Sequence, residues 1–91
     1  MQTISKANLE AVVNRINGLT ESPDKPYVKI GDKYVAQIGC YHLSGAYGGY
    51  ALHRMVNDGG GTADVLHSGH VPKRELYELM HAFIRGIEST I

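Results

Sequence analysis

Glycine is concentrated in the middle of this chain of 91 residues. Eight of the eleven glycines lie between Gly39 and Gly69. Glycine weakens helices, because its backbone loses more freedom on folding than that of any other residue, and it favours tight turns. The distribution therefore indicates short strands joined by turns in the centre of the chain.

Both ends of the chain carry a helical pattern. Residues 5–17 have one apolar stripe, made by Leu9, Val12, Val13 and Ile16. Ser5 is placed to cap this helix, and Gly18 is placed as its left-handed C-terminal residue. A second helix is predicted from Pro72 to the C-terminus, where the period of 3.6 residues is kept by Leu76, Leu79, Met80, Phe83, Ile84 and Ile87.

Three strands are predicted between the helices, at residues 27–30, 33–43 and 50–57. Gly31 and Asp32 suit a two-residue hairpin turn. Residues 44–49 then form a six-residue loop. The order is α-β-β-β-α, which predicts a single α+β domain over residues 1–91, with a three-stranded antiparallel sheet and both helices packed on one face.

The predicted pairing assigns the side chains to two faces of the sheet. Ile30 pairs with Lys33 across the first turn, and Leu43 pairs with Tyr50 across the loop. One face then carries Val28, Ile30, Val35, Tyr41, Leu43, Tyr50, Leu52 and Val56. The other carries Tyr27, Tyr34, Ala36, Ile38, Cys40, His42, Ala51, His53 and Met55. Neither face is polar, but a bulge at Gly39 would move every later side chain to the opposite face, so both registers stay open.

An apolar second face is typical of a surface that contacts a partner. The partner-binding residues predicted on this basis are Tyr27, Tyr34, Ile38, His42, Tyr47, His53 and Met55. The partner is either another protein or a second copy, since a chain with zero formal charge tends to self-associate.

Nine basic and nine acidic side chains argue against a general nucleic-acid binder, which needs a basic excess. A local cluster is still present where the last helix begins. A phosphate or carboxylate there would meet free backbone N–H groups, whereas the alternative is a solvated first turn. The anion or nucleic-acid candidates are Arg54, His70, Lys73 and Arg74, with Arg85 as a further cation.

Five histidines and one cysteine raise the question of a metal site. The candidate ligands are Cys40, His42, His53, His67 and His70, but their spacing matches no paired C-x-x-C or H-x-x-x-H framework. Half-buried histidines and a packed thiol are the favoured interpretation. The central glycines are not followed by Gly-Lys-Ser/Thr, nor by a helix, so no nucleotide loop is predicted. We expect no metal, no cofactor, no catalytic residue and no enzymatic activity.

The cellular setting follows from what the chain lacks. A single cysteine permits no intrachain disulfide and fits a reducing compartment. The first residues contain no apolar run typical of a signal peptide, and no stretch is long enough to span a membrane. We therefore expect a cytoplasmic protein.

Two resemblances add to this interpretation. The α-β-β-β-α order resembles that of double-stranded RNA-binding domains, whose second helix grips phosphates at its start, where Lys73 and Arg74 fall here. The connection at Gly31 and Asp32 is much shorter than the contacting loop of that family. The run YHLSGAYGGYALHRMVNDGGG, together with GHVPKRELYELMHAFIRGIE, resembles small uncharacterised proteins of bacteriophages and prophages. That resemblance implies a bacterial host cell and a protein that binds a host factor or a defence complex.

The sequence thus favours a non-enzymatic binding module of phage or prophage type, acting on a protein partner or as a homodimer. The alternative is a nucleic-acid-binding protein that uses the basic start of its last helix.

Overall fold

The computed structural model describes residues 3–90 and has the predicted α+β class. Two helices flank five strands in the order α1 (Lys6–Leu19), β1 (Tyr27–Ile30), β2 (Lys33–Ala36), β3 (Tyr41–Ala46), β4 (Gly49–Met55), β5 (Thr62–Asp64) and α2 (Lys73–Glu88). The strands form two antiparallel sheets, a two-stranded β1-β2 hairpin and a three-stranded sheet in the order β3-β4-β5. No helix within residues 3–90 has both the length and the apolar character needed to cross a bilayer.

Helix α1 begins as predicted and ends later than predicted. The Ser5 hydroxyl accepts a hydrogen bond from the Asn8 N–H, and the Asn8 side chain accepts one from the Ser5 N–H, which closes a capping box. The prediction for Gly18 is wrong, because the helix continues through it to a cap at Thr20. The left-handed residue of this connection is Glu21, with φ of 54°.

Helix α2 begins one residue after Pro72, which is its N-cap. Its apolar stripe is buried at Leu76, Met80 and Ile84, as the period predicts. Leu79 is the exception, because it is 36% exposed on the outer side of the helix.

The predicted strand 33–43 is in fact two strands, which belong to different sheets. The chain leaves strand geometry between Gln37 and Cys40, where Gly39 has φ of 92°. The Gly39 N–H donates to the Met55 carbonyl, and the Met55 N–H donates to the Cys40 carbonyl. Two residues therefore face one, which is a bulge at the position where the sequence allowed one.

The first hairpin has the predicted register, with Ile30 opposite Lys33 and Val28 opposite Val35. The second hairpin differs, because strands β3 and β4 extend to a two-residue turn at Tyr47 and Gly48. Leu43 therefore pairs with Leu52, not with Tyr50. Within β3 and β4, this shift of two residues leaves each side chain on the face predicted for it, because side chains alternate with a period of two. The bulge at Gly39 changes faces only relative to β1 and β2, which belong to the other sheet.

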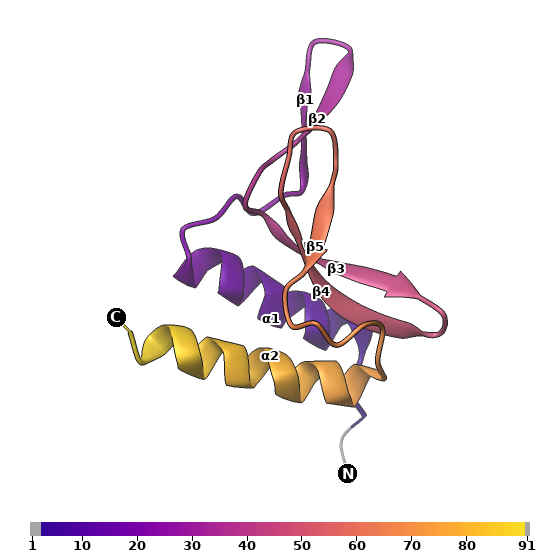
Figure 1. Ribbon diagram of the computed structural model, residues 1–91, viewed down its shortest axis with the longest axis vertical. Coiled ribbons are helices and arrows are strands. Elements are labelled where there is room, and N and C mark those ends of the chain that lie inside the picture. The colour runs from indigo at the N-terminus through magenta and orange to yellow at the C-terminus, as the bar shows by residue number, and fades with distance from the viewer. Residues whose placement is uncertain (1–2, 91) are drawn as a thin grey trace.

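Both helices cover the same face of the three-stranded sheet (Figure 1). The core between them consists of Leu9, Val12, Val13, Ile16, Tyr41, Leu52, Leu76, Met80 and Ile84. The Tyr41 and Phe83 rings lie 5.9 Å apart, which joins β3 to α2. We call this unit the body.

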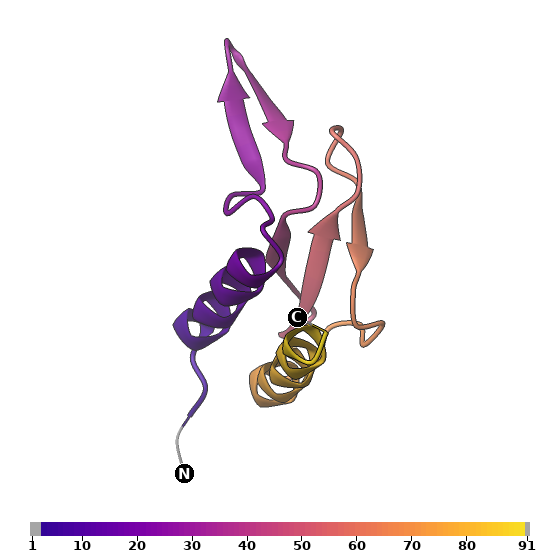
Figure 2. The same cartoon turned by 90° about the vertical axis from the view of Figure 1, so that its left-hand side faces the viewer.

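The β1-β2 hairpin projects away from the body (Figure 2). We call residues 27–38 the arm. Its base is held by two backbone hydrogen bonds, from Ala36 N–H to Asp58 and from Gln37 N–H to Pro26. A small separate cluster of Ala36, Cys40 and Met55 fills the junction.

The projection of the arm overturns part of the predicted core face. Val28 and Ile30 are 41% and 63% exposed, although they were expected to lie under the helices. Val56, which follows β4, is 50% exposed for the same reason: no helix reaches this end of the molecule.

Candidate binding site

The arm exposes large apolar side chains on both of its sides. Tyr34 is 71% exposed and Ile38 is 60% exposed, and the Tyr27 ring is about half exposed. Cross-strand pairing places Lys29 beside Tyr34 on one side of the hairpin, and Ile30 beside Lys33 on the other. Each side therefore combines apolar groups with one lysine, and neither strand contains a carboxylate.

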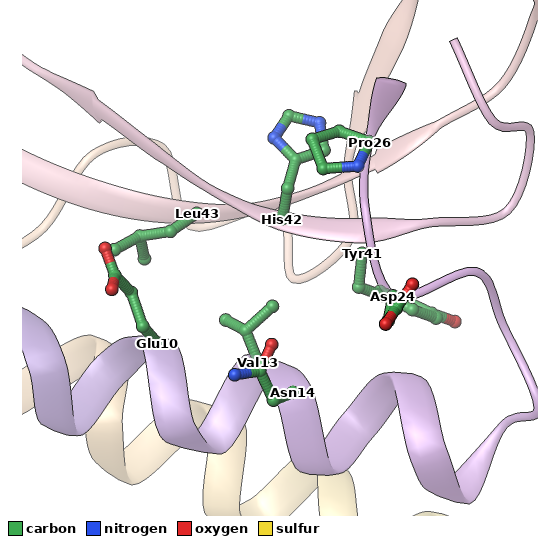
Figure 3. A pocket seen from close by; sticks show the side chains of 8 residues that line it. All are labelled: Glu10, Val13, Asn14, Asp24, Pro26, Tyr41, His42 and Leu43. Carbon is green, nitrogen blue, oxygen red and sulfur yellow. The ribbon is translucent and has the colours of Figure 1, made fainter. Parts of the chain in front are cut away.

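A second feature lies at the foot of the arm, where a pocket of about 230 Å³ opens between α1, β3 and residues 24–26 (Figure 3). It is lined by Glu10, Val13, Asn14, Asp24, Pro26, Tyr41, His42 and Leu43. Three of these residues are consecutive in β3. Because successive side chains of a strand point to opposite faces, three in a row can line one pocket only at the edge of the strand. We call this pocket the groove.

The edge of β3 is open because β3 is an outer strand of its sheet. Asn17 covers one position of this edge: its amide donates to the Tyr41 carbonyl at 2.9 Å and accepts from the Tyr41 N–H at 2.8 Å. Tyr41 therefore directs its backbone groups away from β4. The alternation of an antiparallel strand directs those of Leu43 and Gly45 to the same side. Within residues 3–90, no strand pairs with them there.

The groove combines negative charge with apolar walls. Glu10 and Asp24 supply two carboxylates, and Val13, Leu43 and Pro26 supply aliphatic surface. The ring of His42 projects on the opposite side of β3 from Glu10 and Val13 (Figure 3). Burial lowers the pKa of His42, and the neighbouring His53 lowers it further. The imidazole is thus neutral at pH 7, and the groove is acidic overall.

A third feature occupies the face of the sheet away from the helices. His42, His53 and Asp64 form one row across β3, β4 and β5. His70 reaches over this row from the loop before α2: its Nε2 lies 3.0 Å from the Ser44 hydroxyl, and its ring lies 5.8 Å from that of His53. The loop can approach so closely because Gly49 lacks a side chain, since a Cβ there would lie 2.9 Å from the Val71 carbonyl oxygen.

These histidines are not arranged as metal ligands. Among residues 3–90, no group of three histidine, cysteine, aspartate or glutamate side chains could hold a metal ion. Cys40 belongs to the cluster at the base of the arm, fully buried. Burial raises the pKa of its thiol, and Asp24 adds to that effect, so the group is a protonated thiol at pH 7.

The structure places the predicted partner-binding residues in three different surroundings. Tyr27, Tyr34 and Ile38 are on the arm and exposed. His42 and His53 are half-buried in the histidine row, and Tyr47 is 99% exposed at the turn beside His70. Met55 is only 2% exposed, because it fills the junction between the arm and the body, and so it is not a surface residue.

The predicted anion-binding residues do not form one patch. Arg54 lies over the Tyr41 ring, 5.4 Å from its centre, on the side of the sheet that faces the helices. His70 lies across the opposite face of the sheet. Lys73 and Arg74 are at the start of α2, near the beginning of β4, whereas Arg54 is near its end.

The sequence interpretation missed the groove. Glu10, Asp24 and Asn17 were not among the candidates. One signal was present: Asn17 lies four residues after Val13, on the apolar stripe of α1, and a polar side chain on a buried stripe needs a hydrogen-bond partner. Comparison with protein-family models, with curated proteins and with solved structures gives no match.

Proposed function

We propose that this chain is a binding module without catalytic activity, and that it holds a protein partner through its arm. The observation that supports this most directly is the distribution of exposed apolar groups. Of the eight large apolar side chains that are exposed in residues 3–90, five lie within the arm. They are Tyr27, Val28, Ile30, Tyr34 and Ile38.

The arm is a two-stranded hairpin that forms a sheet of its own. Two strands alone are marginally stable in water, and a third strand or a packed surface is normally needed. Here the side chains that could provide such packing point into solvent on both sides of the hairpin. A protein surface laid against the arm would bury tyrosine and isoleucine, which are residues typical of the centre of an interface.

The setting that we propose is the cytoplasm of a bacterial cell, in which a phage or prophage protein would meet a host protein or another copy of itself. The buried, protonated thiol of Cys40 supports a reducing compartment, because it has no partner for a disulfide.

The experiment is an affinity capture from nuclease-treated bacterial lysate, read by mass spectrometry, together with the molar mass of the purified chain by light scattering. The arm variant is Tyr34→Asp/Ile38→Asp. The matched control is Val56→Asp/Leu79→Asp, which adds the same charge at exposed apolar positions outside the arm.

We expect the wild type and the control to bind a protein, or to self-associate, and the arm variant to do neither. Equal behaviour of all three chains would contradict the proposal. Partners recovered only without nuclease would favour nucleic-acid binding instead. In that case affinity falls steeply with salt, by about 0.9 log units per log unit of salt for each phosphate contact.

A further inference from the structure

We propose that the partner of the arm is a second copy of this chain, and that two copies exchange arms, each laying its arm along the β3 edge in the groove of the other. The inference rests on the proposed function and names its partner. Three properties of the arm and the groove support it.

The first property is strand pairing. The edge of β3 presents the backbone of Leu43 and Gly45 with no neighbouring strand in residues 3–90. Such an edge accepts an extended segment as an added strand. The arm is a source of such segments, because β1 and β2 pair only with each other, so each keeps one edge unpaired.

The second property is charge and polarity. The strands of the arm carry Lys29 and Lys33, and the one carboxylate of the arm, Asp32, lies in the turn between them, whereas the groove carries Glu10 and Asp24 and no lysine or arginine. Apolar groups accompany the charges in both surfaces. A lysine has an aliphatic stem and a charged end, which suits a groove with apolar walls and carboxylates.

The third property is symmetry. Each chain has one arm and one groove, so a twofold axis can place both arms in both grooves and close the assembly as a dimer. The contact is then made twice, which doubles the surface that it buries. Exchange would cover the exposed apolar groups of the arm and pair the open edge of β3 at the same time.

The test uses two charge-reversed variants of the full chain. In the groove variant, Glu10→Lys/Asp24→Lys, the groove repels a wild-type arm. In the arm variant, Lys29→Glu/Lys33→Glu, the arm repels a wild-type groove. Each variant alone should halve the molar mass measured by light scattering after size exclusion. The control Glu75→Lys/Glu78→Lys, on the exposed side of α2, should remain a dimer.

An equimolar mixture of the two variants is the decisive sample. In a mixed pair, the reversed arm meets the reversed groove and the wild-type arm meets the wild-type groove, so both contacts are complementary again. We expect the dimer mass to return. A separate experiment uses only wild-type protein, as a mixture of ¹⁵N-labelled and unlabelled chains. A zero-length carbodiimide cross-link should join an arm lysine of one chain to a groove carboxylate of the other.

Three outcomes would overturn the inference: a monomeric wild type, a dimer that persists in both variants, or a mixture that stays monomeric. Circular dichroism shows whether each variant is folded, and the cross-link in wild-type protein does not depend on any variant. A monomeric wild type that still captures a different protein through its arm would contradict arm exchange but would agree with the proposed function. A wild type that neither forms a dimer nor captures another protein would contradict both arm exchange and the proposed function.

Discussion

The side chain of Asn17 pairs with the backbone of Tyr41 as a neighbouring strand would. One amide group satisfies both the N–H and the carbonyl of Tyr41, at 2.8 and 2.9 Å, and Asn17 is only 2% exposed. The contact closes one end of the open edge of β3 and fixes α1 against the sheet.

Replacement of Asn17 by alanine should strongly destabilise the fold. It leaves the buried N–H of Tyr41 without a partner and its carbonyl with only the weak thiol donor of Cys40, at about 1–3 kcal/mol for each lost amide contact, and the better helix propensity of alanine offsets only about 0.5 kcal/mol. We expect the free energy of unfolding in urea to fall by about 2–4 kcal/mol. Asn14→Ala, an exposed change in the same helix, should leave it nearly unchanged, and equal losses in both variants would contradict this account.

Two glycines should respond to alanine in opposite directions. Gly49→Ala would push its new Cβ against the backbone of His70 and Val71, which can move only if the loop shifts. We expect a loss of about 1–3 kcal/mol. Gly18→Ala, within α1 and with open space around it, should gain about 0.5–1 kcal/mol. Thermal unfolding of both variants is the measurement, and the same sign of change in both would refute the prediction.

The half-buried imidazole of His42 should make the protein less stable in mild acid. The pKa of His42 in the folded chain lies below its ordinary value of 6.5, because burial and His53 disfavour the charged form. The unfolded chain therefore takes up this proton more readily, and the associated stability is complete above pH 6.5 and is lost as the pH falls towards the folded pKa.

The measurement is the urea midpoint between pH 7.5 and pH 5, compared with that of His42→Gln. The variant should show a weaker dependence on pH than the wild type. His67→Asn, at an exposed position, should retain the dependence of the wild type. A His42→Gln protein with an unchanged slope would show that other groups carry the effect.

The thiol of Cys40 should be inert in the native protein. It is fully buried, burial raises its pKa, and its sulfur lies 3.4 Å from the Tyr41 carbonyl oxygen. Reaction with a disulfide reagent at pH 8 should be at least about tenfold slower than in concentrated urea, because it requires opening of the arm junction. Rapid labelling of the folded chain would mean that this junction opens easily.

The arm should be the least protected strand pair when it is not covered. In the groove variant, the amides of Val28 and Val35, which pair across the arm, should exchange with solvent at least about tenfold faster than those of His42 and His53, which pair across β3 and β4 in the body. In wild-type protein at high concentration the arm should become protected. Hydrogen exchange followed by NMR measures both, and a fully protected arm in the monomer would contradict the picture of a marginal hairpin.

The sequence was sufficient for both helices, for the register of the arm and for the two faces of the β3-β4 hairpin, but it predicted three strands where the structure has five. The apolar period located both helices, and the Gly31 and Asp32 turn set the register of the arm. Even the wrong loop length between β3 and β4 preserved the faces, because an error of two residues returns each side chain to its own side.

The separation of the arm from the body was not predictable in the same way. Residues 37–40 continue a strand-like pattern, and only the backbone at Gly39 shows that the strand ends there. The order of strands depends on the whole sheet. The sequence of β3 alone therefore does not show that β3 has an open edge. The contact between Ser44 and His70 joins residues 26 positions apart and depends on the packing of a loop over Gly49.

The two clusters of buried side chains leave most of the arm outside the core, which matters for engineering of the protein. Neither cluster includes a side chain from residues 27–34. Substitutions in this short hairpin should therefore cost the buried core little, which makes the arm a suitable place to graft a foreign sequence.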